Sequence, residues 1–215
     1  MNGMRKWPPG GRWWAGVAGG AIAFPIAVLL HELGHFGADV ALGLPDPVLR
    51  YASASWSGSG EFTRLFRAGD VEAAAAIAEP WKVAVSAAAG PIVSYIAIIA
   101  CVLAIRRFGF GPLSLVFAIG LVTPFRWTWV FPVLYLRLRG ARVEWGPDEV
   151  VVGVITGIPQ FLMILLGLAS LVLGYWFLVT AIPRGRRVRT VVPALVGAVL
   201  GGVLWVLWVG PLVLP

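Results

Sequence analysis

Five long apolar stretches follow one another along the chain, separated by shorter polar segments. They cover about residues 15–44, 81–105, 112–136, 148–182 and 191–214. A helix needs roughly 20 apolar residues to cross the hydrocarbon core of a bilayer, and each stretch reaches that length. Arginines lie at the ends of the second and third stretches and before the fifth. The pattern predicts an all-α polytopic membrane protein with about five transmembrane helices.

The one substantial polar connection, about residues 45–80, begins with a different periodicity. From Tyr51 to Ser57, polar side chains alternate with Ala52, Ala54 and Trp56, which is typical of a β-strand. A lone strand beside a bilayer must pair with something. We therefore expect a small membrane-associated β-hairpin or strand after the first helix, lying on the membrane surface or pairing with an extended peptide. The alanine-rich residues 61–79 predict a short interfacial helix.

Composition excludes the soluble classes. The chain has 215 residues, of which 59% are hydrophobic and 13% are charged, against about 45–50% and about 25% in soluble domains. A single cysteine, Cys101, excludes a disulfide scaffold. We interpret the net charge of +7 as loop charge near lipid headgroups rather than as a nucleic-acid surface. The prediction is one integral membrane domain, residues 1–215, of a multi-pass protein in the cell membrane; the arginine distribution leaves its orientation open.

Glycine pairs at a spacing of four occur in three of the apolar stretches. They are Gly16-x-x-x-Gly20, Gly153-x-x-x-Gly157 and Gly197-x-x-x-Gly201. Small residues at this spacing let helix backbones approach closely inside a membrane. We expect these pairs to mark helix–helix contacts rather than chemistry.

The first apolar stretch contains His31-Glu32-Leu33-Gly34-His35. On a helix His31 and His35 are about 40° apart around the axis, so both imidazoles face one side and suit one zinc ion. Glu32 lies about 100° away, where it can hold and deprotonate a water at the metal. Ionisable groups inside a membrane helix are functional by default. The alternative is a polar cluster that only helps helices to associate.

A catalytic zinc ion usually has three protein ligands, and the chain has no third histidine. The remaining ligand must be a carboxylate or Cys101. Asp39 follows His35 by four residues, but about 12 Å of helix rise separates it from His31. Three successive turns of a straight helix cannot converge on one ion, so we interpret Asp39 as a helix-end charge.

Asp148 is the best remaining candidate for the third ligand. It opens the fourth apolar stretch and could be carried into the membrane on the end of that helix. The alternative is an acid favoured at a helix N-terminus by the dipole. Glu149 and Glu144 are the neighbouring alternatives.

These residues resemble the motifs of the site-2 protease family of intramembrane zinc metalloproteases. The likeness lies in the His-Glu-x-x-His helix, in residues 89–94, and in an aspartate that begins a later helix. Residues 89–94 are similar to the family's Gly-Pro-x-x-Asn stretch, with Ser94 in place of asparagine. The family's Leu-Asp-Gly corresponds here to residues 147–149. The resemblance spans about residues 29–159 and implies a catalytic core over about 15–182, with an extra C-terminal helix over about 190–214.

The resemblance implies hydrolysis of peptide bonds within or next to transmembrane segments of membrane protein substrates. It assigns Zn²⁺ to His31, His35 and Asp148, and catalysis to Glu32. Substrate binding is expected at Gly90, Pro91 and Ser94. Because a membrane helix hides its peptide bonds, a substrate must unwind, and we expect it to pair with the strand around Ala54 and Ser55.

The expected partners are a transmembrane protein or peptide substrate and the lipid bilayer, but no nucleic acid. Whether the chain forms a homo-oligomer stays open. Two other functions compete with the protease. One is a non-catalytic zinc-binding membrane scaffold or chaperone, although Glu32 is retained. The other resembles CAAX prenyl proteases, whose Glu-x-x-x-Asp-like pattern is not met, since Glu72 is followed by Ala76.

Overall fold

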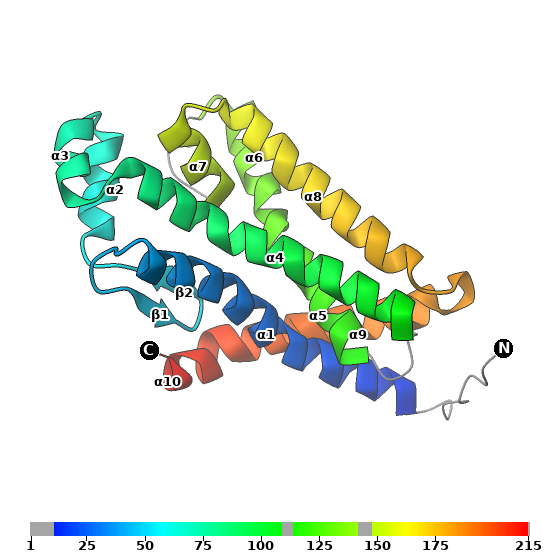
Figure 1. Cartoon of the computed structure of the whole chain (residues 1–215). Helices are drawn as coiled ribbons and strands as arrows, with labels where there is room; N and C mark the ends of the chain where they lie inside the picture. The colour runs from blue at the N-terminus through cyan, green and yellow to red at the C-terminus, as the bar shows by residue number, and fades with distance from the viewer. Residues whose placement is uncertain (1–10, 109–113, 142–147, 215) are drawn as a thin grey trace. The chain divides into compact units, whose positions relative to one another are not determined.

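The computed structural model describes residues 11–108, 114–141 and 148–214, and most of them lie in helices (Figure 1). Within these ranges five helical segments are long and apolar enough to cross a membrane. They are Trp13–Ala41, Pro80–Phe108, Val116–Leu138, Gln160–Thr180 and Arg184–Val213. A two-stranded antiparallel sheet follows the first of them. The predicted fold class, an all-α polytopic protein with a small hairpin, is confirmed.

The elements follow the apolar pattern with several interruptions. In chain order they are α1 (Gly11–Ala41), β1 (Val48–Arg50), β2 (Ser53–Ser55), α2 (Ser59–Arg67), α3 (Val71–Ile77), α4 (Pro80–Phe108), α5 (Ser114–Val122), α6 (Val130–Leu138), α7 (Asp148–Thr156), α8 (Gln160–Thr180), α9 (Arg187–Leu204) and α10 (Gly210–Val213). A 3₁₀ segment, Thr123–Trp129, joins α5 to α6 around Pro124, which cannot donate an α-helical hydrogen bond. Residue 112, the predicted start of the third stretch, lies outside the described residues.

The chain divides into two compact units. One comprises Met1–Leu29, Ser94–Arg126 and Ser170–Pro215, and the other comprises Leu30–Val93 and Trp127–Ala169. Helices α1, α4 and α8 each contribute residues to both units. The predicted metal ligands and the hairpin all belong to the second unit.

Small residues bring helices α1 and α9 into backbone contact within the first unit. A Cβ added at Gly20 would lie 1.9 Å from the carbonyl oxygen of Ala194, and one added at Gly197 would lie 1.9 Å from that of Val17. The predictions for the first and third glycine pairs are confirmed. The buried core beside this contact also consists of small side chains: Ala23, Ala27, Ala118, Val122 and Ala198.

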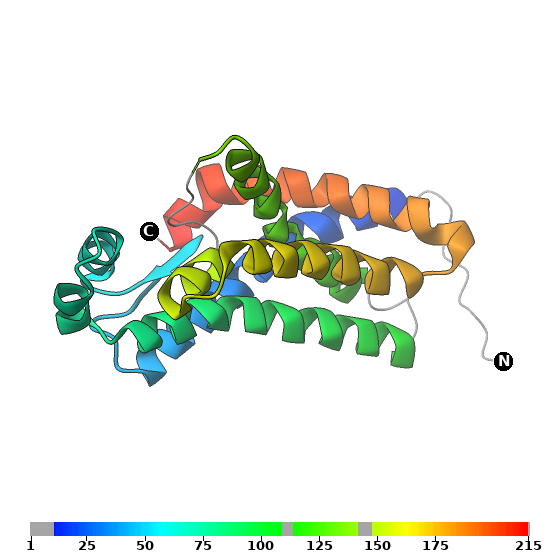
Figure 2. The same cartoon turned by 90° about the horizontal axis from the view of Figure 1, so that it is seen from above.

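Two apolar clusters hold the second unit together. Trp56, at the end of the hairpin, packs edge-on against Phe62 of α2, with ring centroids 6.0 Å apart. Helices α2 and α3 lie side by side in both views (Figures 1 and 2). The second cluster joins α6, α7 and α8 through Val130, Val133, Val150 and Ile164. The first cluster therefore fixes the hairpin, and the second fixes the helix that begins at Asp148.

The hairpin differs from the single strand that the alternation predicts over residues 51–57. Tyr51 and Ala52 form the turn, β2 begins only at Ser53, and β1 lies before the predicted strand. The register pairs Val48 with Ser55 and Arg50 with Ser53. The alternation is therefore correct for the second strand and wrong for its start, since side-chain period alone does not mark a turn.

Residues 61–79 form two helices rather than the single predicted helix. Gly69 adopts a φ of +82°, a left-handed conformation that ends α2. Asp70 then caps α3, because its carboxylate accepts a hydrogen bond of 3.1 Å from the backbone N–H of Ala73. Lys82 and Trp81 donate to the Glu79 carboxylate at the start of α4, and these hydrogen bonds lower the pKa of Glu79.

The fourth apolar stretch is also two helices. Gly157 ends α7 with a φ of +74°, and Pro159 lacks the N–H that would continue the helix. Only one glycine of the pair in this stretch therefore lies at a packing contact. Gly153 faces Met163 closely, whereas Gly157 turns the chain. The break produces a short helix, α7, whose first residue is Asp148.

Candidate metal centre

Helix α1 presents two imidazoles toward one point. The Nε2 atoms of His31 and His35 are 3.1 Å apart, and the rings meet edge to face with centroids 4.7 Å apart. One helical turn separates the two residues, so this approach follows from their spacing. Each histidine thus directs its Nε2 atom to the same small volume.

Asp148 supplies a third donor atom. Its Oδ2 atom lies 3.1 Å from His31 Nε2 and 3.5 Å from His35 Nε2. Ligand atoms placed tetrahedrally at about 2.0–2.1 Å from a zinc ion are separated by about 3.3 Å. The three measured separations, 3.1, 3.1 and 3.5 Å, bracket that value. His31, His35 and Asp148 could therefore hold one metal ion.

The hydrogen bonding of His35 selects the tautomer that a metal requires. Its Nδ1 atom lies 2.7 Å from the backbone carbonyl oxygen of Ser86 on α4. A carbonyl can only accept a hydrogen bond, so Nδ1 carries the proton and the neutral ring keeps a lone pair on Nε2. Orienting partners of this kind are usual for metal-ligating histidines.

Gly90 provides the space that the two rings occupy. A Cβ at this position would lie 2.2 Å from Nε2 of His35 and 2.7 Å from Cε1 of His31. Gly34 faces the same helix, where an added Cβ would lie 2.8 Å from the carbonyl oxygen of Ala89. Helices α1 and α4 can approach this closely only because both positions lack a side chain.

Glu149, the neighbouring acid within the described residues, is not part of the donor group. Glu149 is buried, and its carboxylate accepts a hydrogen bond of 2.8 Å from the indole N–H of Trp127. Successive residues of a helix point about 100° apart, so Glu149 anchors α7 while Asp148 faces the histidines. Glu144 lies outside the described residues.

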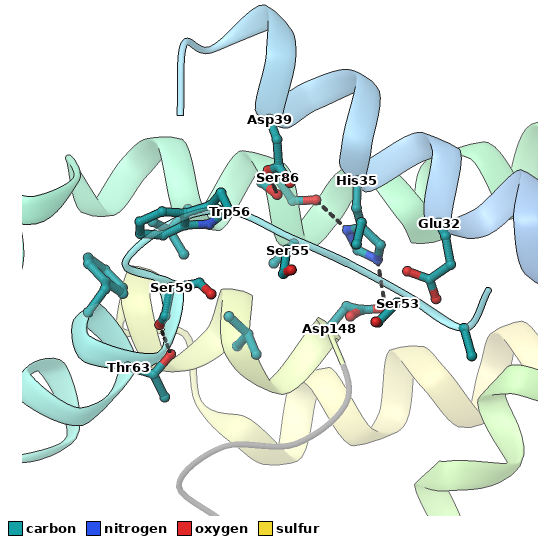
Figure 3. Close-up of a pocket in the computed structure, with 16 residues that line it drawn as sticks. Glu32, His35, Asp39, Ser53, Ser55, Trp56, Ser59, Thr63, Ser86 and Asp148 are labelled. Carbon is teal, nitrogen blue, oxygen red and sulfur yellow. Dashed lines mark hydrogen bonds and ion pairs between the residues drawn. The ribbon is translucent and has the colours of Figure 1, made fainter. Parts of the chain in front are cut away.

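A cavity of about 340 Å³ adjoins the donor group, and Glu32, His35 and Asp148 form one end of its wall (Figure 3). The Glu32 carboxylate points toward His35 and Asp148. The backbone of Ala54 on β2 lies close to this carboxylate. The cavity wall continues along the hairpin from Ala52 to Trp56 and on to Ser59 and Thr63 of α2.

The residues predicted to bind substrate have different positions. Ala54 and Ser55 line the cavity. Gly90 lies against the histidine rings, and Pro91 is buried one residue further along α4. Ser94 is buried at 1% exposure and is not part of the cavity wall.

Two polar residues of this region have roles that sequence analysis did not predict. Asp39 lies in the last turn of α1, as predicted, but it is only 1% exposed and accepts a hydrogen bond of 2.5 Å from the Ser86 hydroxyl. It is also outside the donor group, as predicted, but its burial and its contact with Ser86 do not follow from the sequence. Ser86 lies in an apolar, alanine-rich part of α4, where the sequence holds no signal that distinguishes it.

Comparison of the chain with family models, with curated proteins and with solved structures found no match.

Proposed function

We propose that this chain is an intramembrane zinc metalloprotease of the site-2 protease type. In this proposal it hydrolyses peptide bonds within or next to transmembrane segments of membrane proteins. The observation that carries the proposal is the convergence of His31, His35 and Asp148 next to a cavity whose wall also contains Glu32. Three of these four residues lie on α1, a helix apolar enough to cross a membrane.

The donor set favours zinc. Two imidazole nitrogens and one carboxylate oxygen with nearly tetrahedral separations are the ligands of many hydrolytic zinc sites, which keep a fourth position open. A bound zinc ion would lower the pKa of water toward neutrality and polarise the scissile carbonyl. His31, His35 and Asp148 would hold it.

Glu32 has the position of a general base. Its carboxylate lines the cavity together with His35 and Asp148. In the proposed reaction a water molecule attacks the carbonyl carbon of the peptide bond, and Glu32 accepts a proton from that water. The C–N bond then breaks, and Glu32 passes the proton to the leaving nitrogen, so that a carboxylic acid and an amine are formed.

The hairpin offers a backbone edge to an unwound substrate. Arg50 and Ser53 flank the two-residue turn and form the hydrogen-bonded pair beside it. The following pair, Leu49 and Ala54, is therefore not hydrogen-bonded, and the Ala54 N–H points away from β1. In an antiparallel pair the N–H and C=O of one residue share a direction. Ala54 therefore presents both groups toward the cavity. An extended substrate strand would pair there, close to the Glu32 carboxylate.

The first test is the zinc content per chain of protein purified in detergent. We expect about one zinc ion in the wild-type protein and in Glu149→Gln, and none in Asp148→Ala. Glu149→Gln is the matched control because it changes the adjacent acid while keeping an acceptor for Trp127. Zinc retained by Asp148→Ala would remove Asp148 from the site, and no zinc in any variant would contradict the proposed zinc site.

The second test is cleavage of a single-span membrane protein that carries a helix-breaking glycine and proline in its span. We expect Glu32→Gln to bind zinc normally and to lose cleavage by at least 100-fold. Cleavage by Glu32→Gln at the wild-type rate would contradict the proposed role of Glu32. A chelator should abolish wild-type cleavage, and added zinc should restore it.

A further inference from the structure

Asp39 is an unexpected residue for its place in the fold. It lies in the last turn of α1, which ends at Ala41, and it is 1% exposed. The carbonyl end of a helix disfavours a negative charge, and burial disfavours it further. No basic residue occupies the last turn of α1 to offset this. The carboxylate must therefore be compensated by specific contacts.

Those contacts lead to the metal centre. Asp39 Oδ1 accepts the Ser86 hydroxyl at 2.5 Å, and the backbone oxygen of Ser86 accepts Nδ1–H of His35 at 2.7 Å. Asp39 and His35 are one turn apart on α1, so both reach the same residue of α4 (Figure 3). Ser86 is itself buried, at 7% exposure. Side chain and backbone of one serine are thus held by two successive turns of α1.

We propose that Asp39 is a positioning residue of the metal centre and acts through Ser86. By holding the Ser86 hydroxyl, it fixes the carbonyl that orients the His35 ring and keeps the proton on Nδ1. This inference rests on the proposed zinc site. Asp39 does not coordinate the ion, since it stands two turns from His31 and outside the donor group.

The burial of Asp39 also argues against a role in binding substrate. A carboxylate that received a substrate side chain would present an accessible surface, whereas Asp39 exposes 1% of its own. The polar groups that open more widely onto the cavity belong to the hairpin and α2, namely Ser53, Ser55, Ser59 and Thr63. Asp39 closes the wall of the cavity behind His35.

The first readout needs no metal. The chain has two histidines, so protein labelled with ¹⁵N-histidine has a simple spectrum. In metal-free wild-type protein we expect the Nδ1–H proton of His35 to be shielded from exchange with water. Asp39→Ala and Ser86→Ala should each expose it, whereas Ser59→Ala, which removes another hydroxyl of the same cavity, should not.

The second readout is zinc affinity, measured by competition with a chelator. We expect Asp39→Ala and Ser86→Ala each to weaken binding by about 10- to 100-fold. The double variant should be no weaker than the weaker single variant, because the two residues act in one chain of contacts. Asp39→Asn keeps an acceptor for the hydroxyl and should stay within about threefold of wild type. The visible spectrum of bound Co²⁺ should change in the alanine variants alone.

Three results would overturn the inference. One is wild-type zinc affinity and wild-type His35 exchange in Asp39→Ala and Ser86→Ala. The second is a double variant whose loss equals the product of the single losses. The third is an Asp39→Asn variant that binds zinc as weakly as Asp39→Ala. If the wild-type protein binds no zinc, the proposed function fails, and the exchange of His35 Nδ1–H still decides whether Asp39 orients this ring.

Discussion

Gly90→Ala is a substitution for which helix propensity and tertiary packing have opposite effects on stability. Gly90 lies inside α4 with an ordinary helical conformation. On helix propensity alone, alanine would stabilise the chain by about 1 kcal/mol relative to glycine. The added Cβ, however, would lie 2.2 Å from His35 Nε2 and 2.7 Å from His31 Cε1. Both contacts fall on the imidazole rings of the candidate metal centre.

The size of the conflict follows from these distances. Real Cβ atoms rarely approach a heavy atom within about 3.4 Å, so the His35 ring must move by about 1.2 Å, the difference from 2.2 Å. Ligand distances in metal sites vary by only about 0.2 Å. We therefore expect zinc affinity to fall at least 10-fold, because the loss of an outer-shell partner that orients a ligand already costs about 10- to 100-fold. Overpacking of about 1–3 kcal/mol outweighs or cancels the gain in propensity, so the metal-free protein should be no more stable than wild type.

Gly37→Ala is the matched control, since Gly37 lies on α1 with nothing within 4 Å of an added Cβ. It should bind zinc as wild type does and unfold at the same or a slightly higher temperature. The assay is chelator competition for zinc, with thermal unfolding in detergent measured in the presence of EDTA. Wild-type zinc affinity in Gly90→Ala would refute the reasoning that this glycine makes room for the histidines.

Three further substitutions test other contacts. Trp127→Phe removes the indole N–H that Glu149 accepts, so we expect a loss of about 1–3 kcal/mol in unfolding free energy, measured by denaturant titration. Gly197→Ala should lower the melting temperature because its Cβ would meet helix backbone at 1.9 Å; Gly185→Ala, with open space around it, should not. Ala54→Pro should reduce cleavage without changing zinc content, since its N–H points away from β1; unchanged cleavage would remove the edge strand from substrate binding.

Properties that depend on nearby residues could be predicted from the sequence. The five helical segments long and apolar enough to cross a membrane follow from the length of each apolar stretch, and the facing of His31 and His35 follows from a spacing of four. Breaks inside apolar stretches were missed although a signal exists. Gly157 and Pro159 are typical of a helix end, but the continuous hydrophobicity around them favoured a single helix.

The choice among the acids near the third ligand needed tertiary structure. Asp148 and Glu149 are adjacent and chemically similar, and sequence alone favours the first only because it begins the apolar stretch and matches the aspartate of a family motif. What separates them is Trp127, 22 residues upstream, whose N–H holds the Glu149 carboxylate. Once Glu149 is held, the helical rotation of about 100° turns Asp148 toward α1.

The partner of Asp39 could not be predicted, but its burial could have been suspected. Ser86 is one small residue in an alanine-rich run, and no periodicity distinguishes it. Asp39, by contrast, continues the series His31, His35 at a spacing of four and sits where the helix dipole disfavours an acid. A solvated acid would gain no stabilisation from that position or that face of the helix. An acid on the ligand face and at the unfavourable end of the helix is therefore a signal of a contact with the metal centre's surroundings, and here the contact is the serine that orients His35.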